Sequence, residues 1–493
     1  MKKYIIAVMN VSKTINFQSL FLSIVLMSPA ITSFLYFNLI WEALSAITGI
    51  VLFYHIFKII NIKYTIPLTF MPLGYTLFII LNNRTIGYKS LIAGFNTNIN
   101  ETVSFISGRG TFFLIWLLIF VLTTLIILKL SGEIGHCKFN LKTVIISGSI
   151  FLLLPFLGAS KAYPFFPFFT YENYQKQISA FQNYKDIVFT GDISKSDKSA
   201  CYILIIGEDT RRDALYKIFD SGIQYKGIAA TNTTFSSVLS MLSLLDSKNY
   251  DQIPYHPNII KMVKKVGFST ELMESQKSIK VHRYFINNEV DNIIKCDTDM
   301  ALVQKLDLKK GKFIIGHLQG CHYSFRRQLP KKLRKGSSYE EKYYNAVKYN
   351  KMVMEKLINK IKISNIPVFL LYASDHGESL NDKHDGNYGH NVKYLNQFEL
   401  KIPFIVYYNK KFNELHPQKC GNFLKNRNKE ATHDSIAHTF TGLLNIKSEY
   451  YNANKDLTSE SFRKNSIQVI DDNLKIIDYE SIKKRDAMQC ASF

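Results

Sequence analysis

The sequence has few cysteines, and no two of them stand close together in the sequence. The six stand at positions 137, 201, 296, 321, 420 and 490, with no CxxC element and no regular spacing. A zinc ribbon requires such pairs, and a disulfide framework requires a patterned set. Internal repeats and low-complexity tracts are also missing. The sequence therefore gives no support for a zinc ribbon, a disulfide scaffold or a repeat architecture.

Basic arms are also missing, although the formal net charge is +22. The Lys residues are dispersed and accompanied by many Asn, Ile and Tyr residues. A nucleic-acid-binding chain usually gathers its Lys and Arg residues in a patch or tail. We therefore expect no nucleic-acid partner, and we interpret the excess as compositional bias with some attraction to an anionic membrane surface.

Charge is scarce in the first part of the chain, up to about Gly158, whereas the sequence beyond about Asp192 is mixed and polar. With 493 residues the chain is too long for one ordinary core. Crossing a bilayer takes about 20 apolar residues per helix. The sequence predicts five transmembrane helices, near Gln18–Leu39, Glu42–Ile60, Ile66–Leu81, Thr111–Leu130 and Thr143–Gly158.

Lysines lie before the first predicted span and in the loops after the second and fourth. The positive-inside rule therefore places the N-terminus in the cytoplasm and everything after Gly158 outside. A cleaved signal peptide followed by soluble helices is the alternative, which several successive spans make less favourable. We predict a transmembrane domain at 1–160, a bridging segment on the outer membrane surface at 161–198, and a soluble domain at 199–493.

The predicted external loop between the third and fourth spans carries Thr97 and Glu101. One interpretation is a capped helix, with Glu101 in its first turn. A carboxylate beside the membrane surface can also hold the ammonium group of a lipid headgroup. Both interpretations remain open.

Strand patterns alternate with helical stretches after residue 199. Apolar runs predict four buried strands, at Cys201–Ile206, Lys312–Gly316, Ile366–Ala373 and Ile402–Tyr408. Residues 336–362 suit a surface helix. This order predicts a layered α/β domain, in which ligands bind at the carboxyl ends of the strands.

Polar side chains stand at these strand ends. Asp375 and His376 follow one strand and can bind zinc or manganese together, although a turn with a surface His is the alternative. Glu208 follows another strand, either as a metal ligand or as an acid at a helix start. Thr234 lies beside a predicted helix N-terminus, which suits phosphate binding or simple capping. His322, beyond the strand at 312–316, is either a site residue or a loop His.

Four short elements resemble the membrane-bound phosphoethanolamine transferases, and the resemblance covers nearly the whole chain. Gly207–Arg211 is similar to the family's Gly-Glu-x-x-Arg element, and Gly320–Tyr323 to its Gly-Ser-His element. Thr234–Leu242 is similar to its Thr-x-x-Ser-Val-Pro-Cys-Met-Phe element, and Ser374–Leu380 matches its Ser-Asp-His-Gly-Glu-Ser-Leu element. The resemblance implies five transmembrane helices joined to an α/β/α catalytic domain of the alkaline phosphatase or sulfatase fold.

The resemblance also implies the roles of individual residues. Thr234 would be the nucleophile and, with Glu208, Asp375 and His376, would bind one or two zinc ions, manganese being less favoured. His322 and His390 would contact the phosphoryl group. Thr97 and Glu101 would contact the donor headgroup, and Gln276 would make a further substrate contact.

The implied reaction transfers phosphoethanolamine from phosphatidylethanolamine, through an ester on Thr234, to an envelope glycolipid, either at a lipid A phosphate or at a lipopolysaccharide core sugar. The enzyme would be a monomer in the bacterial inner membrane with a periplasmic catalytic domain. Leu239 and Ser240 replace the family's Pro-Cys pair, Ala93 replaces a donor-site Asn, and the usual cysteine pattern is missing. These departures indicate a divergent branch.

Two other functions fit part of the sequence. A glycerophosphate transferase, phosphodiesterase or sulfatase would use the same fold, although a sulfatase needs a modifiable Cys or Ser where Thr234 stands. A non-enzymatic membrane receptor or transporter would bind no metal at this position and would carry polar residues along its spans, where few occur.

Overall fold

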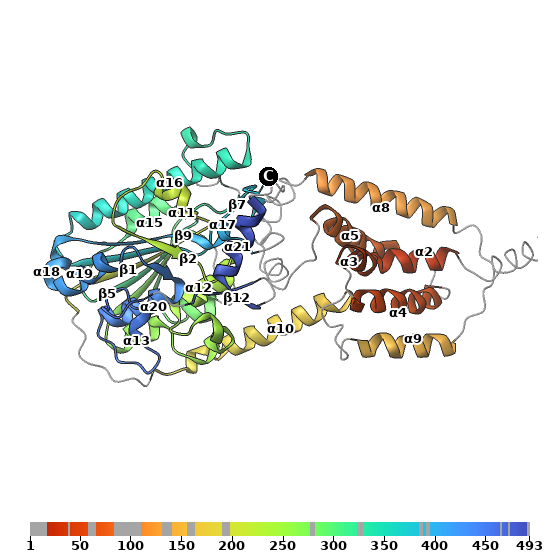
Figure 1. Cartoon of the computed structure of the whole chain (residues 1–493), viewed down its shortest axis with the longest axis horizontal. Helices are drawn as coiled ribbons and strands as arrows, with labels where there is room; N and C mark the ends of the chain where they lie inside the picture. The colour runs from red at the N-terminus through yellow and green to blue at the C-terminus, as the bar shows by residue number, and fades with distance from the viewer. Residues whose placement is uncertain are drawn as a thin grey trace, which may run out of the picture. The chain divides into compact units, whose positions relative to one another are not determined.

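A computed structural model describes residues 17–490, with gaps at 38–39, 58–65, 83–109, 131–140, 155–162, 190–197, 277–281, 324, 326–328, 384–387, 391–394, 464–465 and 472–473. The chain divides into two compact units, Met1–Gln175 and Lys176–Phe493 (Figure 1). The three-part division predicted from the sequence stays a prediction.

The described part of the first unit is helical. Its elements are α2 (Phe17–Leu26), α3 (Ser28–Phe37), α4 (Ile40–Phe57), η2 (Ile66–Thr69), α5 (Phe70–Asn82), α8 (Gly110–Leu130) and α9 (Leu141–Leu153), and α10 (Phe165–Gln182) continues into the second unit. The first predicted span is divided into α2 and α3. Pro29 accounts for this break because it lacks a backbone N–H and its ring crowds the preceding turn.

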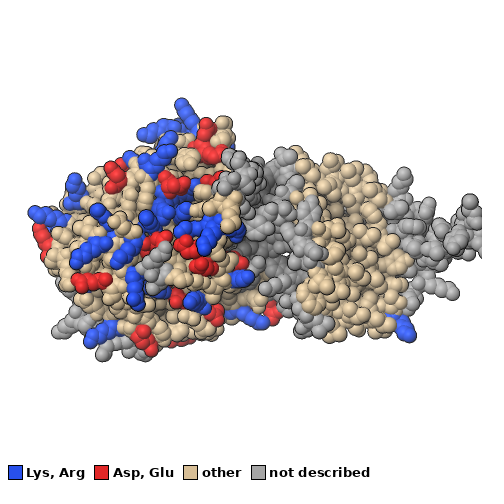
Figure 2. Space-filling view, viewed as in Figure 1, with Lys and Arg blue, Asp and Glu red and all other residues tan. Residues whose placement is uncertain are grey.

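Large apolar side chains cover the outside of this unit. Leu35, Met71 and Leu114 are 72%, 71% and 69% exposed, and the visible surface of these helices is mostly uncharged, whereas the second unit carries charges of both signs (Figure 2). Water-soluble surfaces rarely expose so much contiguous apolar area. Among the described residues, α4 alone has the full length and apolarity of a membrane span, and Leu114–Ile126 and Leu141–Leu153 are shorter apolar helices. The count of five crossings stays a prediction.

The second unit is built on a sheet of eight strands in the order β10-β2-β9-β6-β1-β5-β3-β4. All neighbouring strands are parallel except β9, which is antiparallel to β2 and β6. The strands are β1 (Cys201–Gly207), β2 (Ile223–Ile228), β3 (Ser269–Glu274), β4 (Asn292–Lys295), β5 (Lys312–His317), β6 (Val368–Ser374), β9 (Lys401–Tyr408) and β10 (Glu430–Thr432). The four strands predicted from the sequence correspond to β1, β5, β6 and β9.

Helices cover both faces of this sheet. They are α11 (Arg212–Tyr216), α12 (Thr234–Leu242), α13 (Ile259–Lys265), α15 (Asp299–Lys305), α16 (Tyr339–Lys362), α17 (Gln397–Leu400), α18 (Lys410–Leu415), α19 (Pro417–Asn426), α20 (His433–Leu443) and α21 (Tyr479–Cys490). Short helical turns are η5 (Tyr184–Asp186), η6 (Ser247–Tyr255), η7 (Arg283–Asn287), η8 (Lys331–Leu333) and η9 (Ala453–Lys455), and two small hairpins pair β7 (Ser379–Leu380) with β8 (Tyr388–Gly389) and β11 (Gln468–Ile470) with β12 (Ile476–Asp478).

Alternating side chains of the central strands point into two separate cores. Ile203 and Ile205 of β1 pack in the same cluster as residues of α11, α15 and α16. On the other face, Phe369 of β6 contacts the rings of Phe412, Phe423 and Phe440 from α18, α19 and α20. Every residue of β1 and β6 is buried, which explains why these two strands are nearly continuous apolar runs in the sequence and do not alternate with polar residues. The predicted α/β/α layering of the soluble domain is confirmed.

Candidate functional site

Two acidic residues meet where the central strands end. β1 and β6 are parallel with Gly207 opposite Ser374, so the next residues, Glu208 and Asp375, leave the sheet side by side. The N–H of Asp375 donates to the carbonyl of Gly207 at 3.0 Å, which fixes the turn. Both carboxylates are buried, at 1% and 0% exposure. The expectation that the strand ends bring these residues together agrees with the structure.

Thr234 is the first residue of α12, and Thr233 is the N-cap. The Thr234 hydroxyl donates to Glu208 Oε1 at 2.7 Å and lies 3.5 Å from His376 Nε2. The first N–H groups of a helix have no partner within it, so they favour an anion such as a phosphate at this position. The hydroxyl therefore lies both beside the strand-end residues and at an anion-binding helix end.

His376 presents a lone pair to the same position. Its Nδ1 lies 2.9 Å from the carbonyl of Gly377, which only accepts hydrogen bonds, so Nδ1 carries the proton. Burial, followed by the charge of His390, lowers the pKa of His376 to about 3, so the ring is neutral. Nε2 is therefore unprotonated, 3.2 Å from Asp375 Oδ2. The Thr234 proton is directed to Glu208, and Asp375 Oδ2 accepts no well-aligned hydrogen bond from a described residue.

Several electron-rich atoms thus converge in a small buried space. Ligand atoms of Glu208, Asp209, Asp375 and His376 all lie within 4.8 Å of one another. Burial and the neighbouring charges of Glu208 and Asp209 raise the pKa of Asp375 well above its usual range. Burial would also raise the pKa of Glu208, but the hydrogen bond with His317 and the charges of His322 and His376 hold it below its usual range. A cation would relieve this crowding.

The chemistry of the donor set fits zinc. Two carboxylates, one imidazole nitrogen and one hydroxyl oxygen make four ligands of the kinds that zinc binds in catalytic sites. Magnesium and calcium prefer sets of oxygen ligands only, and His376 Nε2 does not suit them. The residues therefore match a zinc ion better than the hard cations.

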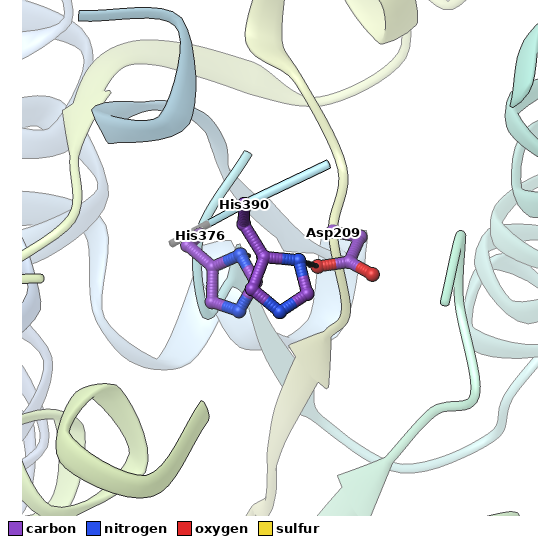
Figure 3. A group of neighbouring side chains, drawn as sticks. All are labelled: Asp209, His376 and His390. Carbon is purple, nitrogen blue, oxygen red and sulfur yellow. Dashed lines mark ion pairs between the residues drawn. The ribbon is translucent and has the colours of Figure 1, made fainter. Parts of the chain in front are cut away.

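A third acid, Asp209, was not among the residues predicted from the sequence. It is fully buried, and its Oδ1 lies 3.1 Å from His376 Nδ1 and 3.2 Å from His390 Nδ1. Figure 3 shows the three side chains gathered together. Its φ of 54° lies in the left-handed region. The adjacent Glu208 was chosen because it comes first after the strand, and nothing in the local pattern reveals the turn that also directs Asp209 into the site.

His390 and His322 both lie within electrostatic reach of these acids. His390 Nδ1 lies 3.0 Å from Glu378 Oε2. Burial opposes a charge on this ring, yet the carboxylates of Asp209 and Glu378 raise the pKa of His390 well above its usual range. Burial likewise opposes a charge on His322, while Asp209 and Glu208 raise its pKa. Both predicted phosphoryl-side histidines are thus favoured as cations.

His317, the last residue of β5, is a further residue that sequence reasoning missed. Its Nε2 lies 3.5 Å from Glu208 Oε2, and the amide of Gln276 contacts both side chains, donating to Glu208 Oε2 at 2.7 Å. His322, two residues beyond Gly320, was preferred to His317 in the sequence. The position of His317 at a strand's carboxyl end was the signal that could have identified it.

Buried charges fix the loops that carry the site. Asp299 accepts hydrogen bonds from the N–H groups of Gln319 and Gly320, at 2.8 and 3.0 Å, and so holds the loop before His322. Gly320 has a φ of 53°, and a Cβ on it would lie 2.6 Å from the carbonyl oxygen of Glu208. Only glycine allows this close approach.

Arg211 joins two of the family-like elements to each other. Its guanidinium is buried, pairs with Asp213 and Asp382, and lies 4.9 Å from the ring centre of Phe398. The Arg of the Gly-Glu-x-x-Arg element therefore holds the loop that follows Ser374–Leu380. This contact gives Arg211 a structural role.

Some of the predicted residues cannot be compared with the structure. Thr97 and Glu101 lie outside the described residues. Gln276 lies against Glu208, and its contact with substrate stays a prediction. The roles assigned to Thr234, His322 and His390 and to the metal ligands also stay predictions, although the structure brings these side chains into one cluster.

Comparisons with known proteins agree with the motifs. Residues 201–446 match the family model described as sulfatase. The phosphoethanolamine transferase EptC of Escherichia coli K12 is 23% identical over 336 residues, which cover 58% of this chain and 58% of EptC. The chain thus spans less than two thirds of this curated relative. The resemblance to phosphoethanolamine transferases is confirmed.

Solved structures show the fold. The integral membrane lipooligosaccharide phosphoethanolamine transferase A of Neisseria meningitidis aligns with a TM-score of 0.62 at 18% identity, covering 90% of this chain and 97% of that one. The periplasmic domain of EptC from Escherichia coli, in a complex with zinc, aligns with a TM-score of 0.53 at 20% identity, covering 61% of this chain and 98% of that domain. The similarity therefore extends over both units.

Proposed function

The chain carries a sulfatase-family domain over residues 201–446, and from this premise we propose that it is a metal-dependent phosphoethanolamine transferase anchored in the bacterial inner membrane. One observation carries the proposal. The partly buried Thr234 hydroxyl lies beside the buried carboxylates of Glu208 and Asp375 and the unprotonated His376 Nε2. A hydroxyl in a cation-binding cluster at a helix N-terminus is suited to attack phosphorus.

The proposed reaction has two steps. Thr234 Oγ1 attacks the phosphorus of phosphatidylethanolamine, the bond to the diacylglycerol oxygen breaks, and a phosphoethanolamine ester remains on Thr234. An acceptor hydroxyl or phosphate then displaces Thr234. Before the first step the Thr234 hydroxyl donates to Glu208 Oε1, with 2.7 Å between the two oxygens. The proton that Thr234 loses is balanced by the proton that the released diacylglycerol oxygen gains. Zinc, when bound by Glu208, Asp375, His376 and Thr234, would supply Lewis acidity that favours the ionised hydroxyl.

The remaining groups act on the phosphoryl oxygens. His322 and His390 are both favoured as cations by the neighbouring carboxylates, so they neutralise negative charge that develops during transfer. The N–H groups at the start of α12 add further donors.

The partners follow from the resemblance and from the apolar first unit. We propose phosphatidylethanolamine as donor and an envelope glycolipid, at a lipid A phosphate or a core sugar, as acceptor. The names of the related proteins and the exposed apolar helices support a multi-pass protein with a periplasmic catalytic domain. Anchoring the site beside two membrane-embedded substrates raises their effective concentration. Thr97 and Glu101 are proposed to receive the donor headgroup.

The first test uses the purified full chain with a fluorescent phosphatidylethanolamine. We expect release of diacylglycerol and an added phosphoethanolamine mass on the peptide that contains Thr234. Thr234→Ala should abolish both. Ser240→Ala is the matched control, because the Ser240 hydroxyl lies on the same helix and donates locally to the carbonyl of Ser236. Equal turnover of wild type and Thr234→Ala would refute the proposed mechanism.

A second test addresses the acceptor. Mass spectrometry of envelope glycolipids from cells with and without the protein should reveal an added phosphoethanolamine on one glycolipid species. Cells that produce Thr234→Ala should match the cells without the protein. An unchanged glycolipid profile would exclude a glycolipid as acceptor while leaving the donor half-reaction open to the first test.

A further inference from the structure

The geometry points to Asp209 as a positioning residue that orients the imidazoles of His376 and His390. This inference rests on the proposed function, since it assumes that His376 binds the metal through Nε2. A ligand atom of Asp209 lies within 4.8 Å of those of Glu208, Asp375 and His376, and we assign Asp209 to orientation because its contact is with the Nδ1 side of His376. Oδ1 of its carboxylate lies 3.1 Å from His376 Nδ1, and Figure 3 shows the carboxylate beside the two imidazole rings.

The backbone of Asp209 is held in a costly conformation. Its φ of 54° is one that few residues other than glycine adopt, although Asp and Asn tolerate it best. The N–H of Asp209 donates to Asp375 Oδ1 at 3.1 Å, and its carbonyl accepts from the Tyr343 hydroxyl at 2.8 Å. Strained residues that are fixed in this way concentrate at functional sites. The main chain is thus determined on both sides, and it directs the carboxylate toward the two rings.

The carboxylate has little else to compensate its burial. Asp209 is fully buried, and neither of its oxygens accepts a well-aligned hydrogen bond from a described residue. A buried charge without compensation costs several kcal/mol (order of magnitude). Nδ1 of His390, a ring favoured as a cation, lies 3.2 Å from Oδ1 and is its ion-pair partner, and the N–H side of the neutral His376 ring lies 3.1 Å from the same oxygen. One negative oxygen therefore attracts the N–H sides of two rings at once.

The orientation that follows suits the metal and the phosphoryl group. With Nδ1 of His376 directed to Asp209 and to the Gly377 carbonyl, Nε2 is left toward Asp375 and Thr234. With Nδ1 of His390 between Asp209 and Glu378, its Nε2 side is the one left for substrate. Carboxylates behind a metal-binding imidazole typically change metal affinity or activity by about 10- to 100-fold.

The test measures zinc binding to the purified full chain by competition with a chromophoric chelator. Asp209→Asn removes the charge, keeps the volume and tolerates a positive φ. We expect zinc affinity to fall by about 10- to 100-fold, with a changed visible spectrum of the cobalt-substituted protein and an unchanged thermal melt of the metal-free protein. Asp220→Asn is the matched control, because Asp220 is an exposed acid of the same unit and belongs to none of the contacts described at the site. It should bind zinc like wild type.

Other outcomes separate this inference from the proposed function. Wild-type zinc affinity and cobalt spectrum in Asp209→Asn would overturn the role of Asp209 and leave the transferase intact. Two zinc ions per wild-type chain, one of them lost in Asp209→Asn, would make Asp209 a metal ligand and also overturn it. A wild type that binds no zinc and releases no diacylglycerol would refute the proposed function. If Asp209→Asn fails to fold, Asp209→Ser answers the same question.

Discussion

Replacing Gly320 by alanine tests whether the site depends on the close approach of two loops. The added Cβ would lie 2.6 Å from the carbonyl oxygen and 2.7 Å from the nitrogen of Glu208, whereas ordinary contact begins at 3.4 Å. That carbonyl also accepts the N–H of Cys321 at 2.9 Å. The substitution therefore pushes on the backbone of a proposed metal ligand without removing any reactive group.

Two magnitudes follow from this geometry. The left-handed φ of 53° at Gly320 costs an alanine roughly 1–2 kcal/mol, which lowers the melting temperature by a few degrees. Restoring ordinary contact requires the loops to separate by 0.8 Å, the difference between 3.4 and 2.6 Å. Metal ligands tolerate about 0.2 Å, and a misplacement of about 1 Å can lower turnover by about 100-fold. We expect turnover and zinc affinity to fall far more than stability.

The assay compares thermal melting, zinc affinity and diacylglycerol release for Gly320→Ala and Gly421→Ala. Gly421 lies in α19, and a Cβ there meets no atom within 4 Å, so alanine should be neutral or stabilise by up to about 1 kcal/mol. Full turnover and wild-type zinc affinity in Gly320→Ala would refute the argument that Glu208 is positioned through this contact.

Three further predictions follow. Chelation should stop diacylglycerol release and lower the melting temperature. If free zinc is first held at 100 times its dissociation constant, its removal costs the folded state about 2.7 kcal/mol. Added zinc should restore turnover and melting temperature, and unchanged turnover after chelation would contradict the metal site. Buried His433, which accepts from the Ala230 N–H and donates to the Ser374 carbonyl, has its pKa lowered by burial to about 4. The stability that neutral His433 contributes is therefore complete above pH about 6.5 and is lost as the pH falls toward 4, by up to about 3 kcal/mol. In His433→Gln the melting temperature should depend less on pH across that range. A pH dependence equal to that of the wild type would argue against this role. Arg211→Lys cannot make the forked contacts to Asp213 and Asp382. The folded state should therefore lose roughly 1.5–3 kcal/mol for each charged hydrogen bond that lysine does not replace, and turnover should fall as the loop after Glu378 loosens. A wild-type melting temperature and turnover in this variant would refute the prediction.

The sequence predicted those parts of the site that local patterns specify. Glu208 and Asp375 follow apolar runs, and Thr234 precedes a helical pattern, so their places at strand ends and at a helix start could be read directly. Neither the left-handed turn at Asp209 nor the inward direction of His317 has a local pattern. Both depend on strand register and on contacts between segments more than a hundred residues apart.

The first unit was predicted in the same uneven way. Hydrophobicity located the helical stretches, because apolar composition is a local property. It did not predict the division of the first span at Pro29.

In the second unit, the sequence also did not predict that β9 runs antiparallel to its neighbours in the sheet. The direction of a strand is set by which neighbours it pairs with, and a run such as Ile402–Tyr408 looks the same in either direction.

The four described cysteines of the second unit, Cys201, Cys296, Cys321 and Cys420, are all free and buried. The loops around the site are fastened instead by Asp299, Arg211 and His433, through ion pairs and bonds to the backbone. These ion pairs and hydrogen bonds form as the chain folds, and they need no oxidant, isomerase or thiol partner. Among the described residues these contacts contain no disulfide that a reducing agent could break, and salt screens buried pairs only weakly. The described loops of the second unit therefore keep their positions through contacts that do not depend on the redox state of these four thiols.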